Sequence, residues 1–170
     1  VLPGTSYLER DGSYVNLGLN LLADNRDAEA EAAFRKTLEL EPDGVAFHQL
    51  LGLALLLQGK TDAALRETRQ ETDEMWRLLN LSLVFHALGR RGESDAALAA
   101  LKGKFAEGAA YQIAEVHAFR GEADLAFEWL ERAYAQRDGG VAEIKGDRLM
   151  RGIVGDPRYK AFLRKLKLPV

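Results

Sequence analysis

The string in this chain that most resembles a reactive site is Ala54-Leu55-Leu56-Leu57-Gln58-Gly59-Lys60-Thr61, which fits the loose phosphate-loop pattern of nucleotide-binding proteins. A phosphate loop needs a glycine-rich turn after a strand, with backbone N–H groups directed at the phosphates. Here the variable positions are three leucines and a glutamine, whose N–H groups we expect to be used inside a helix. Gly59 suits a turn between helices, and Thr61 suits a helix start. Nucleotide binding at residues 54–61 therefore stays only an alternative.

The other side chains that could take part in catalysis or metal binding are dispersed along the sequence. His48, His86 and His117 have no second histidine or carboxylate at zinc-ligand spacing, so we expect them in the core or along a groove, without a metal. Serines and carboxylates show no nucleophile–base signature, and Glu29 and Glu31 indicate a solvated helix face. The sequence thus predicts a non-catalytic protein without a cofactor.

Charge and composition limit the possible partners. The net charge is −3, but the segment from Lys145 onward has eight basic and two acidic residues. Cations near the end of the last helix complement its dipole, which accounts for this segment without nucleic acid or membrane as partner. No apolar run approaches the ~18 residues of a membrane span. The absence of cysteine favours a reducing, cytoplasmic compartment. The chain begins at Val1, and we expect it to be a piece of a longer or processed protein.

Three sets of residues recur along the chain at shared intervals. Apolar–small pairs are separated by 34, 30 and 32 residues, and the same intervals separate a set of turn residues and a set of small residues: Leu17-Gly18, Leu51-Gly52, Leu81-Ser82, Ile113-Ala114; Asn25, Gly59, Gly89, Gly121; Ala30, Ala64, Ser94, Ala126. A period near 34 is that of the tetratricopeptide repeat, a helix–turn–helix unit. We therefore predict an all-α, right-handed superhelix of about four helical hairpins with C-terminal capping helices.

The repeat positions also predict the elements. Eight helices are expected near residues 12–24, 27–41, 43–58, 61–72, 74–88, 92–105, 108–120 and 123–136. Thr68 and Glu71 stand at positions that are normally apolar, so the fourth of these helices should be short or loosely packed. Asp147 can cap a short helix ending near Val154, and Asp156-Pro157 can begin a last helix ending near Leu166. The domain organisation predicted is an extension at 1–10, repeats at about 11–44, 45–74, 75–106 and 107–138, and a capping segment at 139–170.

A narrower resemblance covers residues 74–169. It rests on several stretches: Trp76-Arg77-Leu78-Leu79, Phe85-His86-Ala87-Leu88-Gly89-Arg90, Glu93 to Leu98, Ala110 to Val116, Arg120-Gly121-Glu122, Ala126 to Leu130, Tyr134 to Asp138 and Asp156-Pro157-Arg158-Tyr159. This part resembles the C-terminal repeat region of bacterial signalling proteins, where it follows a cyclase-like, kinase or winged-helix domain. The resemblance implies a regulatory protein–protein interaction scaffold and no reaction.

In such repeats the first helix of each unit lines a concave face that binds partners. The predicted groove consists of Val15, Leu19, Leu22, Gln49, Leu53, Leu56, Trp76, Leu79, Leu83, His86, Tyr111, Glu115 and Phe119. Chaperone-binding members of the family clamp a peptide carboxylate with Lys, Asn and Arg, and this chain has apolar residues or Gln at those places. An amphipathic helix of a partner protein could bind here, with Trp76 and Tyr111 as anchors. Alternatively these residues form core, or the groove is covered by superhelical closure, by residues 1–11 or by a homodimer.

Overall fold

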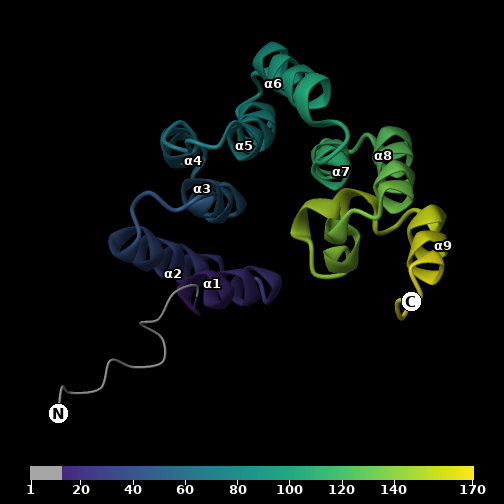
Figure 1. Cartoon of the computed structure of the whole chain (residues 1–170), viewed down its shortest axis with the longest axis horizontal. Coiled ribbons are helices and arrows are strands. Elements are labelled where there is room, and N and C mark those ends of the chain that lie inside the picture. Colours follow the sequence, from purple (N-terminus) through teal and green to yellow (C-terminus); the bar gives the residue numbers. More distant parts are fainter. Residues whose placement is uncertain (1–12) are drawn as a thin grey trace. The chain divides into compact units, whose positions relative to one another are not determined.

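The computed structural model describes residues 13–170, and all regular structure in that range is helical (Figure 1). This confirms the predicted all-α fold. The elements are α1 (Ser13–Ala23), α2 (Asp27–Leu40), α3 (Phe47–Leu57), α4 (Thr61–Thr68), α5 (Glu74–Ala87), α6 (Arg91–Phe105), α7 (Ala110–Phe119), α8 (Ala123–Gln136), η2 (Gly139–Glu143), η3 (Arg148–Ile153) and α9 (Pro157–Lys165).

The chain divides into two compact units, one ending at Asn80 and the other beginning at Leu81, so the boundary falls within α5. In the described part of the chain, each helix is too short or too polar to cross a lipid bilayer. The predicted extension at residues 1–10 lies outside the described residues.

In the first unit, α1 packs on α2, α2 on α3, and α3 on α4. Small residues make this close packing possible, as the repeat pattern predicts. A Cβ atom at Gly18 would lie 2.4 Å from the ring of Phe34, which is itself fully buried. Ala30 and Ala64, early in the second helices, expose none of their surface.

The turns between paired helices follow the predicted residues. Asn25, Gly59, Gly89 and Gly121 have φ angles of 62°, 75°, 71° and 74°. This left-handed conformation ends a helix in a tight turn, and glycine or asparagine adopts it at low cost. These residues therefore recur in the sequence because each turn has the same left-handed backbone conformation.

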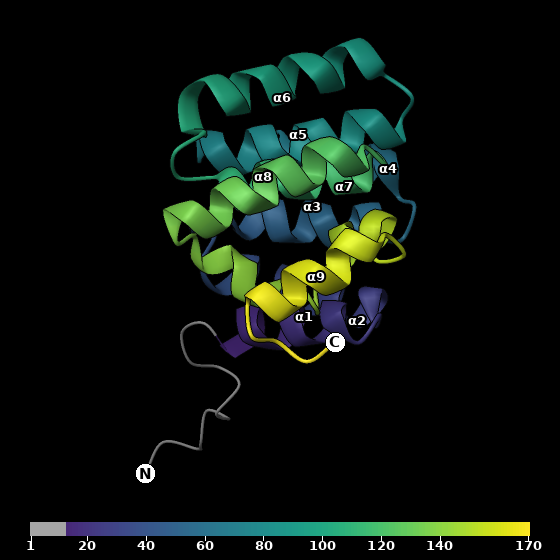
Figure 2. The same cartoon turned by 90° about the vertical axis from the view of Figure 1, so that its right-hand side faces the viewer.

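In the second unit, α7 and α8 form a hairpin, and η2 and η3 pack against it (Figure 1). α9 lies beside α8 (Figure 2), with the rings of Tyr134 and Phe162 in edge contact at 6.4 Å between centroids. Three aspartates begin these last elements, because Asp138, Asp147 and Asp156 each accept a hydrogen bond from a backbone N–H two residues on. The caps predicted at Asp147 and Asp156 are confirmed, and the helix after Asp147 is a 3₁₀ helix.

Two helices differ from the predicted ranges by four residues at one end, and the others by at most two. α3 begins at Phe47 instead of residue 43, because Ala46 has a φ of 68° and cannot continue a right-handed helix backwards. α4 ends at Thr68 instead of 72, as expected for a short helix. The Thr68 hydroxyl donates to the Ala64 carbonyl at 2.7 Å, and the Glu71 side chain turns inward.

Candidate interaction surface

The residues of the predicted groove divide into two groups by burial. Six are buried: Leu22, Gln49, Leu56, Leu79, Leu83 and Tyr111. Seven keep part of their surface exposed: Val15, Leu19, Leu53, Trp76, His86, Glu115 and Phe119. The buried group can contribute stability but no large contact area, so any binding role rests on the exposed group.

Four exposed members of the predicted groove belong to the first unit. Leu19 is 43% exposed, and Val15, Leu53 and Trp76 are half-buried. We call these four residues the first-helix surface. The helices that carry the first three, α1 and α3, contain no Asp, Glu, Lys or Arg. The partner helices α2 and α4 both contain acidic and basic residues. Charge is thus absent from α1 and α3, whereas α5, which carries Trp76, contains Glu74 and Arg77.

Gln49 has a structural role in a buried polar cluster of the first unit. Its carbonyl accepts from Asn80 Nδ2 at 2.8 Å, and its backbone N–H donates to Glu71 at 3.1 Å. Asn80, Glu71 and Thr68 are all buried. These groups satisfy one another, since an unpaired buried polar group would be costly. The polar residues at normally apolar positions of the second repeat are therefore matched to each other.

In the second unit, the chain itself contacts part of the predicted groove. The Tyr111 hydroxyl donates to Asp147 Oδ2 at 2.8 Å. Tyr111 is only 2% exposed, so it offers no free ring for a partner. The prediction that Tyr111 is an open aromatic anchor is therefore wrong, whereas the alternative of cover by residues 1–11 lies outside the described residues.

His86 and Phe119 form the other exposed pair of the second unit. Their rings meet edge to face, 5.8 Å apart between centroids. Both side chains are half-buried. Burial lowers the pKa of His86, and the positive charge of Arg120 adds to this effect. A half-buried imidazole against a phenyl ring gives this pair a largely apolar character.

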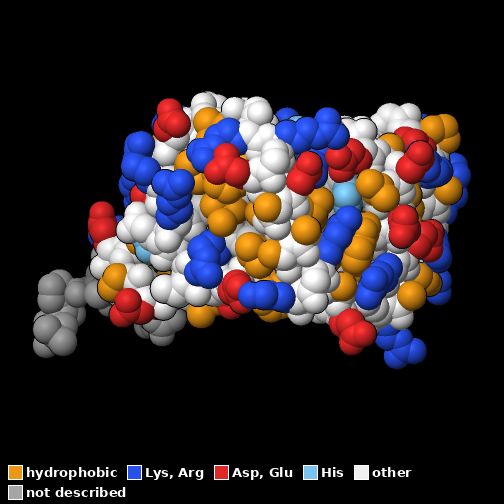
Figure 3. Space-filling view, turned by 90° about the horizontal axis from the view of Figure 1, so that it is seen from above, with side chains coloured by type: hydrophobic (Ala, Val, Ile, Leu, Met, Phe, Trp, Pro, Cys, Tyr) orange, Lys and Arg blue, Asp and Glu red, His pale blue; other side chains and the backbone are white. Residues whose placement is uncertain are grey.

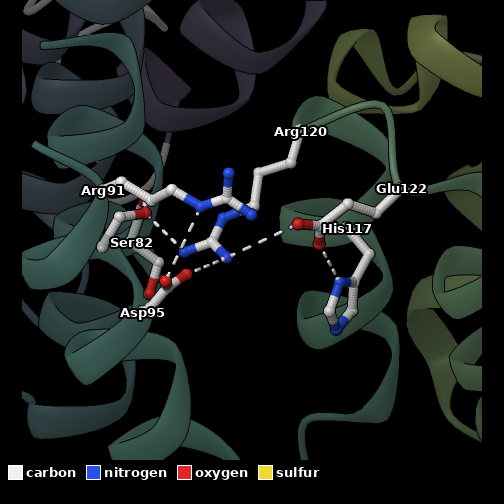
Figure 4. Close-up of polar contacts among 7 residues, drawn as sticks. Ser82, Arg91, Asp95, His117, Arg120 and Glu122 are labelled. Atoms are coloured by element: carbon white, nitrogen blue, oxygen red, sulfur yellow. Dashed lines mark hydrogen bonds and ion pairs between the residues drawn. The ribbon is translucent and has the colours of Figure 1, made fainter. Parts of the chain in front are cut away.

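A buried arginine joins elements of the second unit and was missed by sequence reasoning. Figure 4 shows Arg120, at the end of α7, reaching Asp95 of α6. Its side chain is 5% exposed, and Nη1 donates to Asp95 Oδ1 at 2.8 Å. Nη2 donates to the Ser94 hydroxyl, which in turn donates to the carbonyl of Ser82 in α5. Only a small residue at position 94 leaves room for this chain of contacts.

His117 lies beside this cluster (Figure 4) and is almost fully buried. Its Nδ1 is 2.5 Å from Glu122 Oε2. Burial lowers the pKa of His117, although the hydrogen bond to Glu122 opposes that shift. His48 similarly pairs with Glu67 at 3.0 Å in the first unit. Among residues 13–170 there is no group of three or more potential metal ligands.

The phosphate-loop-like string lies mostly within a helix. Residues 54–57 belong to α3, and the N–H groups of Gln58, Gly59 and Lys60 all donate to carbonyls of Leu55 or Leu56. The Lys60 ammonium is 2.8 Å from Glu31. The backbone and the lysine are therefore both engaged within the chain.

The sequence-based expectation that Glu31 lies on a solvated helix face is wrong. Glu31 is 6% exposed and does not belong to a solvated face. Burial raises the pKa of this carboxyl, but hydrogen bonds from Lys60, Gln58 and Arg35 outweigh burial and hold the pKa below its usual value. Glu29, two residues earlier, is exposed as expected.

A shallow cavity of about 430 Å³ lies between α8 and α9. Phe127 and Phe162 contribute its apolar part. Arg158 and Lys165 of α9 pair with Asp124 and Glu131 of α8, so ion pairs line the cavity as well.

On the face shown in Figure 3, hydrophobic side chains form small areas between charged ones. Such dispersed areas are ordinary for a protein surface.

Comparison with known families gives a match to a segment of the first unit. The family model described as tetratricopeptide repeat matches residues 12–43, the segment that contains α1 and α2. The match supports a tetratricopeptide repeat at these residues. Searches of curated proteins and of solved structures found no match to it.

The match falls on the hairpin in which Gly18 packs against Phe34. In a tetratricopeptide repeat protein, units of this kind stack so that neighbours bury a continuous core. Tetratricopeptide repeats generally mediate protein–protein interaction and are typically non-catalytic. Partner binding by such repeats uses side chains that remain exposed after the helices have stacked.

Proposed function

We propose that this tetratricopeptide repeat protein is a non-catalytic scaffold that binds a segment of a partner polypeptide on the first-helix surface. The observation that carries the proposal is the combination of exposed apolar side chains with charge-free helices. Val15, Leu19, Leu53 and Trp76 keep exposed surface, while α1 and α3 contain no Asp, Glu, Lys or Arg.

The chemistry of this surface favours an amphipathic helix as the bound segment. Such a helix presents apolar residues every three or four positions and can place them on a hydrophobic surface. Trp76 is the best anchor, because tryptophan contributes disproportionately to interface energies. A clamp for a terminal carboxylate needs cations, and Val15, Leu19 and Leu53 supply none.

The cellular role is inferred from the resemblance of residues 74–169 to repeat regions of bacterial signalling proteins. A cytoplasmic regulatory protein would use the scaffold to hold a partner near its own or another signalling domain. We also propose four repeats, at about 11–44, 45–74, 75–106 and 107–138, followed by a capping segment at 139–170. Helix pairs with recurring turn residues support that division.

A capture experiment with matched leucine variants tests the function. The full chain is immobilised and exposed to a lysate of the organism that encodes it, and retained proteins are quantified by mass spectrometry. Leu19→Asp and Trp76→Ala should each deplete the retained partner about tenfold or more. Leu40→Asp is the control, because Leu40 lies on α2 and is 49% exposed, against 43% for Leu19.

Circular dichroism must show equal helix content in all variants. Retention of the same proteins at the same level by wild type and by both first-helix variants would contradict the proposal. Equal loss with Leu40→Asp would also contradict it, because the effect would then be one of any charged substitution.

A further inference from the structure

The cavity between α8 and α9 is bordered by acidic side chains of one helix and basic side chains of the other. Asp124 of α8 accepts a hydrogen bond from Arg158 Nη1 of α9 at 2.7 Å, and Glu131 of α8 pairs with Lys165 of α9. Each pair joins residues 34 positions apart, so the two helices keep one register. The two ion pairs lie about two helical turns apart along α8.

Glu128 lies between these two pairs on α8. It follows Asp124 by four residues and precedes Glu131 by three, so the three carboxylates lie along one side of the helix. At the register of the ion pairs, Glu128 is opposite Phe162, and Ala161 is the next residue of α9 that lines the cavity. Neither of these side chains carries a charge. The row of ion pairs across the cavity is therefore interrupted at Glu128.

No cation of the described part of the chain pairs with Glu128. Its side chain is exposed and forms no ion pair or hydrogen bond within residues 13–170. Glu128 interacts electrostatically with Lys102 of α6, but the ammonium of that lysine lies 5.4 Å from the centroid of the Trp129 ring. Arg132, one turn further along α8, lies over the same ring at 4.8 Å. Both nearby cations thus contact Trp129, and the Glu128 carboxylate keeps an open acceptor.

The walls of the cavity suit the aliphatic part of a basic side chain. Phe127 and Phe162 line it, and Arg158 already lies over the Phe127 ring at 4.6 Å. Lysine and arginine pack their methylene groups on apolar surface while their charged ends reach polar groups. The volume of about 430 Å³ is within the range of ligand-binding cavities.

The charge of the cavity also favours an organic cation. Three acidic and two basic residues line it, so one negative charge has no counterpart. Within residues 13–170 the structure brings no three potential metal ligands together. The missing positive charge is therefore matched by an ammonium or guanidinium group.

We propose that the cavity between α8 and α9 binds a segment of a partner polypeptide that inserts one lysine or arginine side chain beside Glu128 and so completes the row of ion pairs. A polypeptide is favoured over a free amine, because one exposed ion pair contributes little and a polypeptide adds apolar contacts beside it. The inference goes beyond the proposed function, because it concerns the second unit and uses no residue of the first-helix surface.

Selection of peptides by the full chain tests this inference. A phage library of short random peptides is selected on wild type, and peptides that bind Glu128→Gln equally well are removed. The retained peptides should share a lysine or arginine with apolar neighbours. Replacement of that cation by glutamine should weaken binding to wild type about tenfold, measured as Kd by fluorescence anisotropy. The same replacement should weaken binding to Glu128→Gln less than about twofold, because both changes remove one ion pair.

Substitutions in the chain locate the contact. Ala161→Lys places a cation of the chain itself opposite Glu128 and should weaken peptide binding about tenfold. Ala161→Gln adds bulk without charge and should weaken it clearly less. Glu143→Gln is the matched control, since Glu143 is exposed on η2, does not line the cavity and should leave binding unchanged. Leu19→Asp should also leave binding unchanged, which separates this inference from the proposed function.

Circular dichroism must show equal helix content in all these proteins. Retained peptides without a shared cation, or no peptide that distinguishes wild type from Glu128→Gln, would overturn the inference. Equal effects of Ala161→Lys and Ala161→Gln would overturn it too, because space and not charge would then decide binding.

Discussion

Arg120 joins α7 to α6 through one guanidinium group, and it shares its acceptor with a second arginine. Arg120 Nη1 is 2.8 Å from Asp95, and Arg91 Nε is 3.9 Å from the same carboxylate. The two side chains differ greatly in exposure, at 5% for Arg120 and 85% for Arg91. An exposed ion pair is screened by water, whereas a buried donor cannot be replaced by solvent.

Arg120→Ala should therefore lower the free energy of unfolding by about 2 kcal/mol, because it removes the bonds to Asp95 and to the buried Ser94. Arg91→Ala should change it by less than about 0.5 kcal/mol. Urea denaturation followed by circular dichroism measures both. Equal effects of the two substitutions would show that the buried network contributes nothing specific.

Residue types alone do not reveal which polar groups are buried. Ser94 is recognisable as a small residue at a repeat position, and it is buried as expected. Glu31 is not distinguishable from its exposed neighbour Glu29 by sequence, because its burial depends on Lys60 and Gln58 from the next hairpin. Contacts between residues about thirty apart require the packed structure, so these roles could not be predicted.

The ends of helices show where local sequence rules succeed. Asp147 and Asp156 are recognisable as caps, since a short acceptor precedes the helix in each case. The turn residues with positive φ can also be predicted from their spacing. The start of α3 could not be predicted, because alanine at position 46 gives no sign of its left-handed conformation. η2 was missed as well, since it is held by Asp138 and by packing on α8.

The close contact between η3 and α7 can be tested by a substitution at Gly152. A Cβ atom at Gly152 would lie 2.2 Å from the carbonyl oxygen of Ala118, a backbone atom that cannot move aside easily. Gly152→Ala should therefore destabilise the second unit by about 1–3 kcal/mol.

Gly155→Ala is the matched control, because a Cβ atom there would meet nothing within 4 Å. That substitution should change stability by less than about 0.5 kcal/mol, with a slight gain possible from a stiffer unfolded chain. Thermal unfolding of the two variants provides the comparison. A Gly152→Ala protein as stable as wild type would mean that η3 does not pack closely on α7.

At the scale of the whole molecule, the two units present different surfaces. The first unit exposes apolar side chains on α1 and α3, which contain no Asp, Glu, Lys or Arg. In the second unit, Tyr111 is buried and its hydroxyl donates to Asp147. The sequence pattern assigned one continuous groove to both units, because equivalent repeat positions look alike. The capping segment breaks that equivalence, and no repeat position marks it.

The central claim is that the first-helix surface serves another polypeptide and not a second copy of this chain. Light scattering across a dilution series tests it most directly, with wild type and Leu19→Asp measured side by side. The claim predicts a mass of 18.8 kDa for both proteins at every concentration. A wild-type dimer that persists on dilution and becomes a monomer in Leu19→Asp would contradict it, since the surface would then be closed by self-association.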